Sequence, residues 1–172
     1  WITHNSSYCS AVSNIQREVM IVVSVDPGMK GGLAILDTTS GIALAAPMPT
    51  IGKEIDYRKI HEAFTTSTPD LIVIEKVHAM PGQGVTSMFN FGLSYGAIIA
   101  LASVSKARLV LVPPQMWKKH VLAGTSKDKD AAIQFCNQTY PSINLVLPRC
   151  RKPHDGMADA ICMAHYGAHY IK

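Results

Sequence analysis

The sequence predicts one α/β domain built on a mixed β-sheet with helices against its faces. Three observations predict this fold class. Short apolar, β-branched runs alternate with longer segments of helical periodicity. The first three runs are joined by loops too short for a parallel return, so these strands must be antiparallel. A length of 172 residues is that of one ordinary domain, which can bury a core without disulfides.

The first half of the chain contains four of the predicted strands, at 19–25, 32–36, 42–46 and 71–74. The first strand ends at Asp26-Pro27-Gly28, and the fourth ends at Glu75. Apolar residues at helical spacing predict a helix over 54–65, before Pro69-Asp70.

The second half contains the fifth strand and the remaining helices. The apolar segment 87–104 predicts a long helix, and its small residues, among them Gly92 and Gly96, allow close approach of another backbone. The run at 109–112 predicts the fifth strand. Further helices are predicted near 114–121, 127–140 and 154–170.

Composition excludes several classes of protein. With 48% hydrophobic and 16% charged residues, the chain is neither disordered nor a coiled coil. The four cysteines share no Cys-x-x-Cys spacing, so a zinc ribbon or disulfide framework is not indicated and a reducing compartment is expected. The apolar runs fall short of the ~20 residues of a membrane span, so no membrane partner is expected. Residues 1–18 are expected to form a flexible N-terminal arm and 19–172 a single domain.

Positive charge is concentrated in one part of the chain. Residues 106–152 contain nine Lys or Arg against two acids, although the net charge of the whole chain is only +4. The rest of the chain is therefore acidic. A basic segment of this kind suggests a polyanionic partner such as nucleic acid, with an ordinary solvated surface as the alternative.

Four acidic residues lie at predicted element ends. Asp26 and Glu75 each end an apolar strand, where an unpaired charge is costly. Asp155 and Asp159 lie four apart at the start of the last helix and share a face. Carboxylates from two strands and a helix form the oxygen-only site that Mg²⁺ prefers, and two such ions can promote phosphodiester hydrolysis. Each acid alone is also compatible with a capping or turn role.

Taken together, these features resemble the RuvC branch of the ribonuclease-H-like superfamily, and most closely its plant chloroplast Holliday junction resolvases, the monokaryotic chloroplast group. The resemblance covers about 19–170. It lies in the segments VSVDPGMKGGLAILD, LIVIEKVHAM, SMFNFGLSYGAIIALA, LVPPQMWKKHVLAG, SKDKDAA and HDGMADAICMAHYG.

The resemblance implies a ribonuclease-H-like five-stranded sheet, with three antiparallel strands followed by two parallel ones. It implies a structure-selective endonuclease that resolves four-way junctions by paired nicks, with Mg²⁺ as cofactor, Mn²⁺ as a possible substitute, and no nucleotide cofactor. The implied metal ligands and catalytic acids are Asp26, Glu75, Asp155 and Asp159. Bacterial members space their helix acids three apart and some place His first, so either His154 or Asp155 is the ligand here, with Asp155 favoured by its spacing to Asp159.

Other roles are implied in the same way. Lys127 or Lys129 is expected near the scissile phosphate, with Lys129 ranked first as a catalytic residue and a solvated Lys-Asp-Lys-Asp run as the alternative. His78 stands where bacterial relatives have an aromatic residue that stacks on a base. The full set expected to bind DNA is His78, Met80, Gln83, Lys118, Lys119, Lys127, Arg149, Arg151 and Lys152. Trp117 is expected either on the DNA side or, with slight preference, in the core.

The segment 87–104 resembles the dimer helix of the family. Its apolar side chains exceed what one buried face needs, which predicts a two-fold homodimer that presents two equal sites to a junction. The resemblance also implies location in the chloroplast nucleoid. The alternatives are a non-catalytic junction-binding protein, a ribonuclease acting on RNA–DNA hybrids, and an actin-like or sugar-kinase-like ATPase. The last needs a second α/β domain, for which 172 residues leave no room.

Overall fold

A five-stranded mixed sheet forms the centre of the protein. The computed structural model describes residues 20–78, 82, 84–125 and 130–172, and its main sheet has the strand order β3-β2-β1-β6-β7. Antiparallel pairs join β1 (Ile21–Asp26) to β2 (Gly32–Asp37) and β2 to β3 (Ala43–Pro47). Parallel pairs join β1 to β6 (Leu71–Glu75) and β6 to β7 (Arg108–Val112). The predicted sheet, with three antiparallel strands and then two parallel ones, is confirmed.

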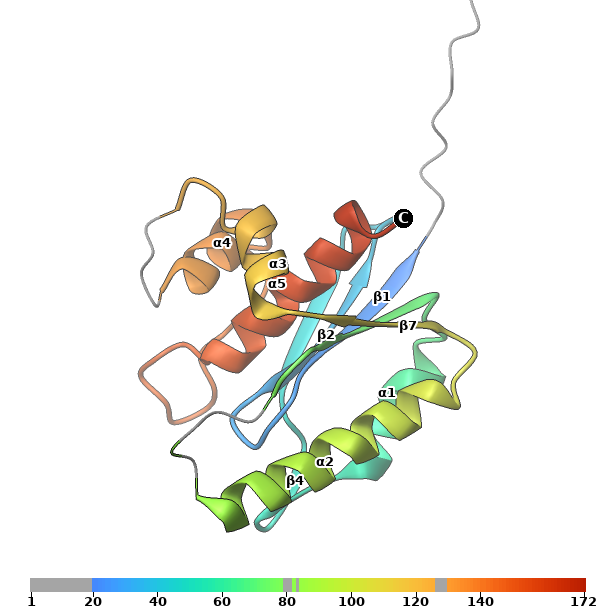
Figure 1. The fold of residues 1–172 in the computed structure, drawn as a ribbon. Helices are drawn as coiled ribbons and strands as arrows, with labels where there is room; N and C mark the ends of the chain where they lie inside the picture. The colour runs from blue at the N-terminus through green and yellow to red at the C-terminus, as the bar shows by residue number, and fades with distance from the viewer. Residues whose placement is uncertain (1–19, 79–81, 83, 126–129) are drawn as a thin grey trace, which may run out of the picture.

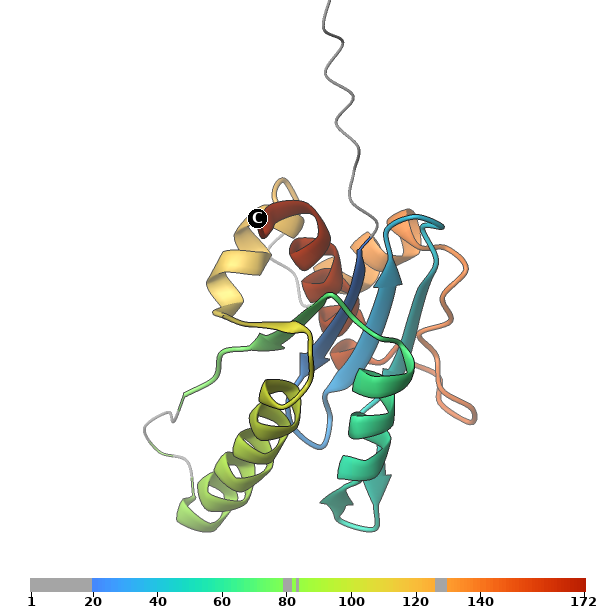
Figure 2. The same cartoon turned by 90° about the vertical axis from the view of Figure 1, so that its right-hand side faces the viewer.

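Helices cover both faces of this sheet (Figure 1). On one face lie α1 (Tyr57–Thr66) and α2 (Val85–Ser103). On the other lie α3 (Pro114–Val121), α4 (Ala131–Thr139) and α5 (Asp155–Tyr170). Figure 2, turned by 90°, shows α1 and α2 descending side by side below the sheet. Each layer has its own buried cluster, with Trp117 and Ile161 in one and Ile60 and Ile98 in the other.

The central strand β1 is buried on both faces. Val22, Val23 and Val25 have no exposed surface, because alternate side chains enter the two clusters. The one polar side chain among them, Ser24, donates its hydroxyl to the carbonyl of Ala160 in α5. This bond satisfies a polar group that would otherwise be costly to bury, and it attaches α5 to the strand that ends in Asp26.

One predicted helix boundary is wrong. The helix predicted from residue 54 begins at Tyr57, because Asp56 caps it by accepting the backbone N–H groups of Arg58 and Lys59. The preceding residues instead form a small hairpin of β4 (Thr50–Ile51) and β5 (Glu54–Ile55). The helix predicted near 127–140 is confirmed as α4 (Ala131–Thr139), and its predicted first residues, 127–129, lie outside the described residues.

Candidate active site

Two of the four predicted acids lie at adjacent strand ends. β1 and β6 run parallel with Val25 opposite Ile74, and the next residue of each strand is Asp26 or Glu75. The residues before each acid are buried, so the strands are held firmly from both sides. The parallel register therefore brings these two carboxylates to one edge of the sheet.

Glycines bring the start of α5 to the same edge. A Cβ added to Gly156 would lie 2.4 Å from the carbonyl oxygen of Lys30, and one added to Gly32 would lie 2.7 Å from the carbonyl oxygen of Gly156. No side chain fits in these gaps, so the turn after Asp26 and the first turn of α5 meet backbone to backbone. Asp155 and Asp159 flank this contact on α5.

The charges of the four acids act on one another. Burial, followed by the negative charges of Glu75 and Asp159, raises the pKa of Asp26 from its ordinary 3.8 to about 8. Burial also raises the pKa of Asp159 from 3.8 to about 6, with further upward contributions from Glu75 and Asp155. Asp26, Glu75 and Asp159 thus repel one another, and Asp155 adds its negative charge to that of Asp159. A bound divalent cation would relieve repulsion of this kind.

Lys118 lies close enough to this group to oppose the repulsion. Its positive charge lowers the pKa of both Asp26 and Asp159. The sequence predicted Lys118 as a DNA contact and missed its place beside the acids. The available signal was the Lys118-Lys119 pair after the fifth strand, which does not distinguish the two lysines. Only the packing of α3 against α5 makes that distinction.

Trp117 supports Glu75 directly. Its side chain is fully buried, and its indole Nε1 donates a hydrogen bond to Oε1 of Glu75 at 3.0 Å. The prediction of Trp117 on the DNA side is wrong, and the preferred core interpretation is confirmed, because the ring belongs to the cluster between the sheet and α5. The Lys118 Nζ lies 5.0 Å from the centre of the same ring, a cation–π distance.

His154 serves as the N-cap of α5. Its Nδ1 accepts the backbone N–H of Met157 at 3.2 Å, which leaves Nε2 as its remaining ring nitrogen. Asp155 is the exposed first helical residue, and its charge raises the pKa of Asp159. The structure therefore accounts for His154 by helix capping and sets Asp155 among the interacting acids.

The described DNA-binding candidates lie on the surface. All six are exposed: His78, Lys118, Lys119, Arg149, Arg151 and Lys152. The last three belong to a loop closed by an antiparallel bridge between Val146 and Pro153, two residues before Asp155. Met80, Gln83, Lys127 and Lys129 lie outside the described residues.

The donor set fits hard cations in its chemistry but is not assembled as a finished metal site. The oxygens of Asp26, Glu75, Asp155 and Asp159 are ligands of the type that Mg²⁺ uses. Among the residues that the structure describes, no group of three or more His, Cys, Asp or Glu is arranged to hold a metal ion. The acids are thus electrostatic neighbours rather than an assembled set of metal ligands.

The outer face of α2 is apolar and uncovered. Val85, Phe89 and Leu93 are 86%, 70% and 63% exposed, whereas Ile98 on the opposite side is buried. The described residues include this one helix that is long and apolar enough to cross a membrane, judged by length and composition alone. The expectation that every apolar run falls short of a membrane span therefore needs correction at α2.

Comparisons with known proteins give a fold and no family assignment. A scan against models of known families finds no match, and a search of curated proteins finds no significant relative. RuvC of T. thermophilus, solved with a Holliday junction substrate, is similar in structure at a TM-score of 0.64 and 16% identity, over 88% of this chain and 94% of that one. The Fowlpox virus resolvase, solved with Holliday junction DNA, has a TM-score of 0.51 and 17% sequence identity. The match covers 87% of this chain and 97% of the viral one. The yeast mitochondrial Holliday junction resolvase Ydc2 has a TM-score of 0.52 and 11% sequence identity. The match covers 85% of this chain and 76% of the yeast one. The chain therefore shares the RuvC-like, ribonuclease-H-like fold of these proteins.

Proposed function

We propose that this protein is a metal-dependent endonuclease that resolves four-way DNA junctions by paired, symmetric nicks. One observation above all supports this function: four acids from two parallel strand ends and one helix form a single coupled group, on the fold that junction resolvases share. A binding module would gain nothing from negative charge turned toward phosphate.

The proposed cofactor is Mg²⁺, with Mn²⁺ as a substitute, held by Asp26, Glu75, Asp155 and Asp159. When bound, such ions supply a water of lowered pKa and neutralise charge on the phosphodiester. The backbone segments that carry these carboxylates are fixed by β1, by β6 and by the glycine contact of α5, so the positions of the acids are fixed as well.

Two further residues of the site orient a carboxylate and balance the negative charge of the acids. Trp117 holds one oxygen of Glu75 through its indole N–H, which leaves the other oxygen for ligation. Lys118 is a positive group beside the acids and is available to a developing negative charge on the phosphoryl oxygens. Lys129, ahead of α4, remains proposed for the same role.

DNA binding is proposed for the exposed basic residues around the acids. Arg149, Arg151 and Lys152 precede the helix that holds Asp155 and Asp159, so a strand bound there passes the acid group. Such contacts to phosphate position the duplex without reading its sequence. His78, Met80 and Gln83 belong to the segment after Glu75 and are proposed to meet bases.

A homodimer through α2 is proposed to present two acid sites to one junction. The exposed stripe of Val85, Phe89 and Leu93 costs free energy in water unless a partner covers it. Apart from the adjoining residues and backbone of α2 itself, no described atom lies within 4 Å of a Cβ added at Gly92 or Gly96, so a second helix can approach the backbone there. Two-fold symmetry would match the equivalent strands of a junction.

The test is a nicking assay on a synthetic four-way junction, with linear duplex and RNA–DNA hybrid as competing substrates, in Mg²⁺ and in EDTA. We expect paired nicks on the junction alone, lost in EDTA. Cleavage of the hybrid instead would assign a ribonuclease. Tight junction binding without nicks in Mg²⁺ or Mn²⁺ would contradict the enzymatic proposal. The sequence resemblance to chloroplast resolvases supports a chloroplast location, which organelle fractionation would test.

A further inference from the structure

The inner side of α2 touches both chain segments that follow the acid-bearing strands. Phe91 packs against the turn that follows Asp26. Tyr95, one helical turn later, contacts the segment that follows Glu75. We propose that these two aromatic residues are positioning residues: they fix the backbone spacing of Asp26 and Glu75, so metal binding depends on how α2 packs. This inference rests on the proposed function.

Phe91 lies against a turn that is joined tightly to Asp26. A Cβ on Gly28 would lie 3.3 Å from Cε2 of Phe91, so the ring lies directly against the backbone of this glycine, whose φ is +113°. Gly31 donates its backbone N–H to the carbonyl of Gly28 at 3.0 Å. A Cβ on Gly31 would lie 1.9 Å from the carbonyl oxygen of Asp26, so the turn folds directly back onto the strand end. A shift of the ring therefore disturbs the backbone of Asp26.

Tyr95 holds the segment after Glu75. Its hydroxyl oxygen accepts the backbone N–H of Val77, two residues after Glu75. Burial, and to a smaller extent the negative charge of Glu75, raises the pKa of Tyr95, so the hydroxyl lies within electrostatic range of that carboxylate. In the same segment, Lys76 donates its backbone N–H to the carbonyl of Val112 in β7 at 2.8 Å. The chain that leaves Glu75 is therefore held by both β7 and α2.

Phe91 and Tyr95 form one stacked unit. Their rings are nearly parallel, with 8° between the planes and 6.3 Å between the centres. Offset parallel stacking is a favoured arrangement of aromatic pairs. Both residues are half-buried, whereas Phe89 on the outer face of the same helix is 70% exposed. One aromatic stack thus joins the turn after Asp26 to the segment after Glu75.

The stack acts on the backbone and not on the carboxylates themselves. Ser24 bonds to α5, and side chains alternate along a strand, so the Asp26 side chain also lies on the α5 side of the sheet. Glu75 accepts the indole N–H of Trp117 on this same side. Tyr95 packs instead against the cluster on the α2 side. Neither ring can therefore ligate an ion, and any effect on metal affinity arises through the positions of the strand ends.

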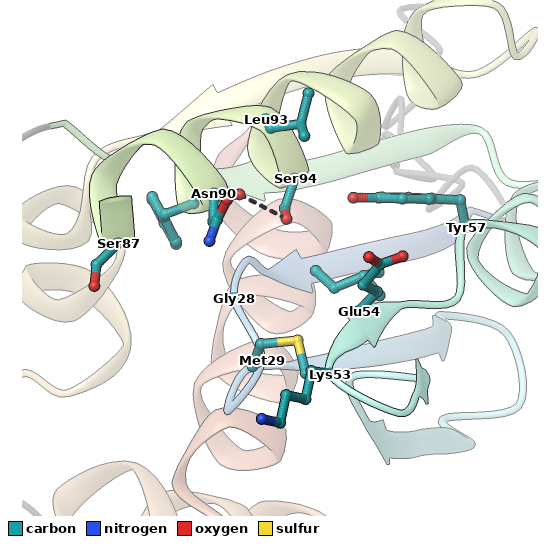
Figure 3. A pocket seen from close by; sticks show the side chains of 11 residues that line it. Gly28, Met29, Lys53, Glu54, Tyr57, Ser87, Asn90, Leu93 and Ser94 are labelled. Atoms are coloured by element: carbon teal, nitrogen blue, oxygen red, sulfur yellow. Dashed lines mark hydrogen bonds between the residues drawn. The ribbon is translucent and has the colours of Figure 1, made fainter. Parts of the chain in front are cut away.

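The first half of α2 depends on contacts such as this stack. Residues 85–94, all within the described part of the chain, include no buried side chain, whereas Ile98 and Ala102 in the second half are buried. A pocket of about 620 Å³ separates the first half from the β4–β5 hairpin, and Figure 3 shows Asn90 and Ser94 across this gap from Glu54. A second copy bound to the exposed stripe of α2 would hold the same half in place, which connects the proposed dimer to the metal site.

The experiment measures metal binding without DNA or cleavage. Mn²⁺ is titrated into the metal-free full chain, and the unbound ion is followed by its EPR signal. Tyr95→Phe removes only a hydroxyl, and we expect the dissociation constant for Mn²⁺ to rise by about fivefold. Phe91→Leu, which removes the flat ring, should give a rise of similar size. A direct hydrogen-bond partner of a ligand typically costs roughly 10- to 100-fold, and the stack acts one step further away.

Matched controls are aromatic residues far from the acids. Tyr170→Phe removes a hydroxyl from the stacked pair of Tyr166 and Tyr170, at the opposite end of α5 from Asp155. Phe135→Leu removes a half-buried ring from α4. Both controls should leave the Mn²⁺ affinity unchanged. Thermal unfolding of all four variants in EDTA reports any general loss of stability.

A second readout separates positioning from the chemical step. In the junction nicking assay, the Mg²⁺ concentration for half-maximal rate should rise with Tyr95→Phe and with Phe91→Leu. The rate at saturating Mg²⁺ should change less than about threefold, because the ion restores the spacing of the acids once it is bound. A merely structural role would instead lower the amount of active protein, and hence the saturated rate, without changing the metal requirement.

Unchanged Mn²⁺ affinity in both variants would overturn the inference, and so would an equal loss of affinity in the two controls. A wild type that binds no Mn²⁺ would overturn it as well. A fall in the saturated nicking rate with an unchanged metal requirement would contradict a positioning role. Absence of junction nicking by wild type would instead refute the proposed function, and the Mn²⁺ titrations would still decide the inference.

Discussion

Replacing Asp26 by Asn tests whether the acid group is built at the expense of stability. Asp26 has a pKa raised from 3.8 to about 8 by burial and by the charges of Glu75 and Asp159. Below pH 3.8 the carboxyl is protonated in the folded and unfolded states alike. Between pH 3.8 and 8 only the unfolded chain gives up the proton freely, so stability falls as pH rises through this window and levels off above it.

The magnitude follows from the two pKa values. The difference corresponds to a ceiling of about 6 kcal/mol at pH 8. Water penetration and side-chain relaxation reduce such penalties, so we expect Asp26→Asn to raise the free energy of unfolding by ~3 kcal/mol at pH 8. For a domain of this size that is roughly 6–12 °C in melting temperature. At pH 4 the gain should nearly vanish.

The measurement is urea unfolding of both chains in EDTA at several pH values from 4 to 9. Glu62→Gln, which removes an exposed charge on α1, is the control and should change little. The variant should also lose metal-dependent nicking and keep junction binding. A stability difference of the same size at pH 4 and pH 8 would refute the electrostatic reasoning, and unchanged nicking would refute the assignment of Asp26.

Three further predictions concern the neighbours of the acids and the face of α2. Trp117→Phe removes the hydrogen bond to Glu75, so the Mg²⁺ concentration for half-maximal nicking should rise severalfold, and an unchanged metal requirement would contradict a supporting role. Lys118→Ala removes a charge that lowers the pKa of the two buried aspartates, so the acidic limb of the rate–pH profile should move to higher pH, whereas Lys119→Ala should leave it in place. Phe89→Glu, at a position 70% exposed, should convert a dimer to a monomer in light scattering with an unchanged melting temperature of the isolated chain, and a persistent dimer would reject the α2 interface.

Local patterns were sufficient to predict most of the fold. The β-branched runs that became β1 and β6 are buried on both faces, and such runs have few alternatives to a central strand. The boundary error at the start of α1 arose where a short-range contact decided the outcome. Asp56 can cap a helix or lie within its first turn, and the bonds to Arg58 and Lys59 made it the cap. The hairpin before it consists of two strands of two residues each, which are too short to leave a periodic signal in the sequence.

The sequence by itself determined that acids end two buried strands and begin the last helix, because burial patterns and spacing are written along the chain. It also determined the apolar excess of the segment that became α2. The tertiary structure alone decided that α3 supplies Trp117 to Glu75 and Lys118 to the acids. These are contacts between residues distant in sequence, and their partners depend on how helices pack on the sheet, which no local pattern encodes.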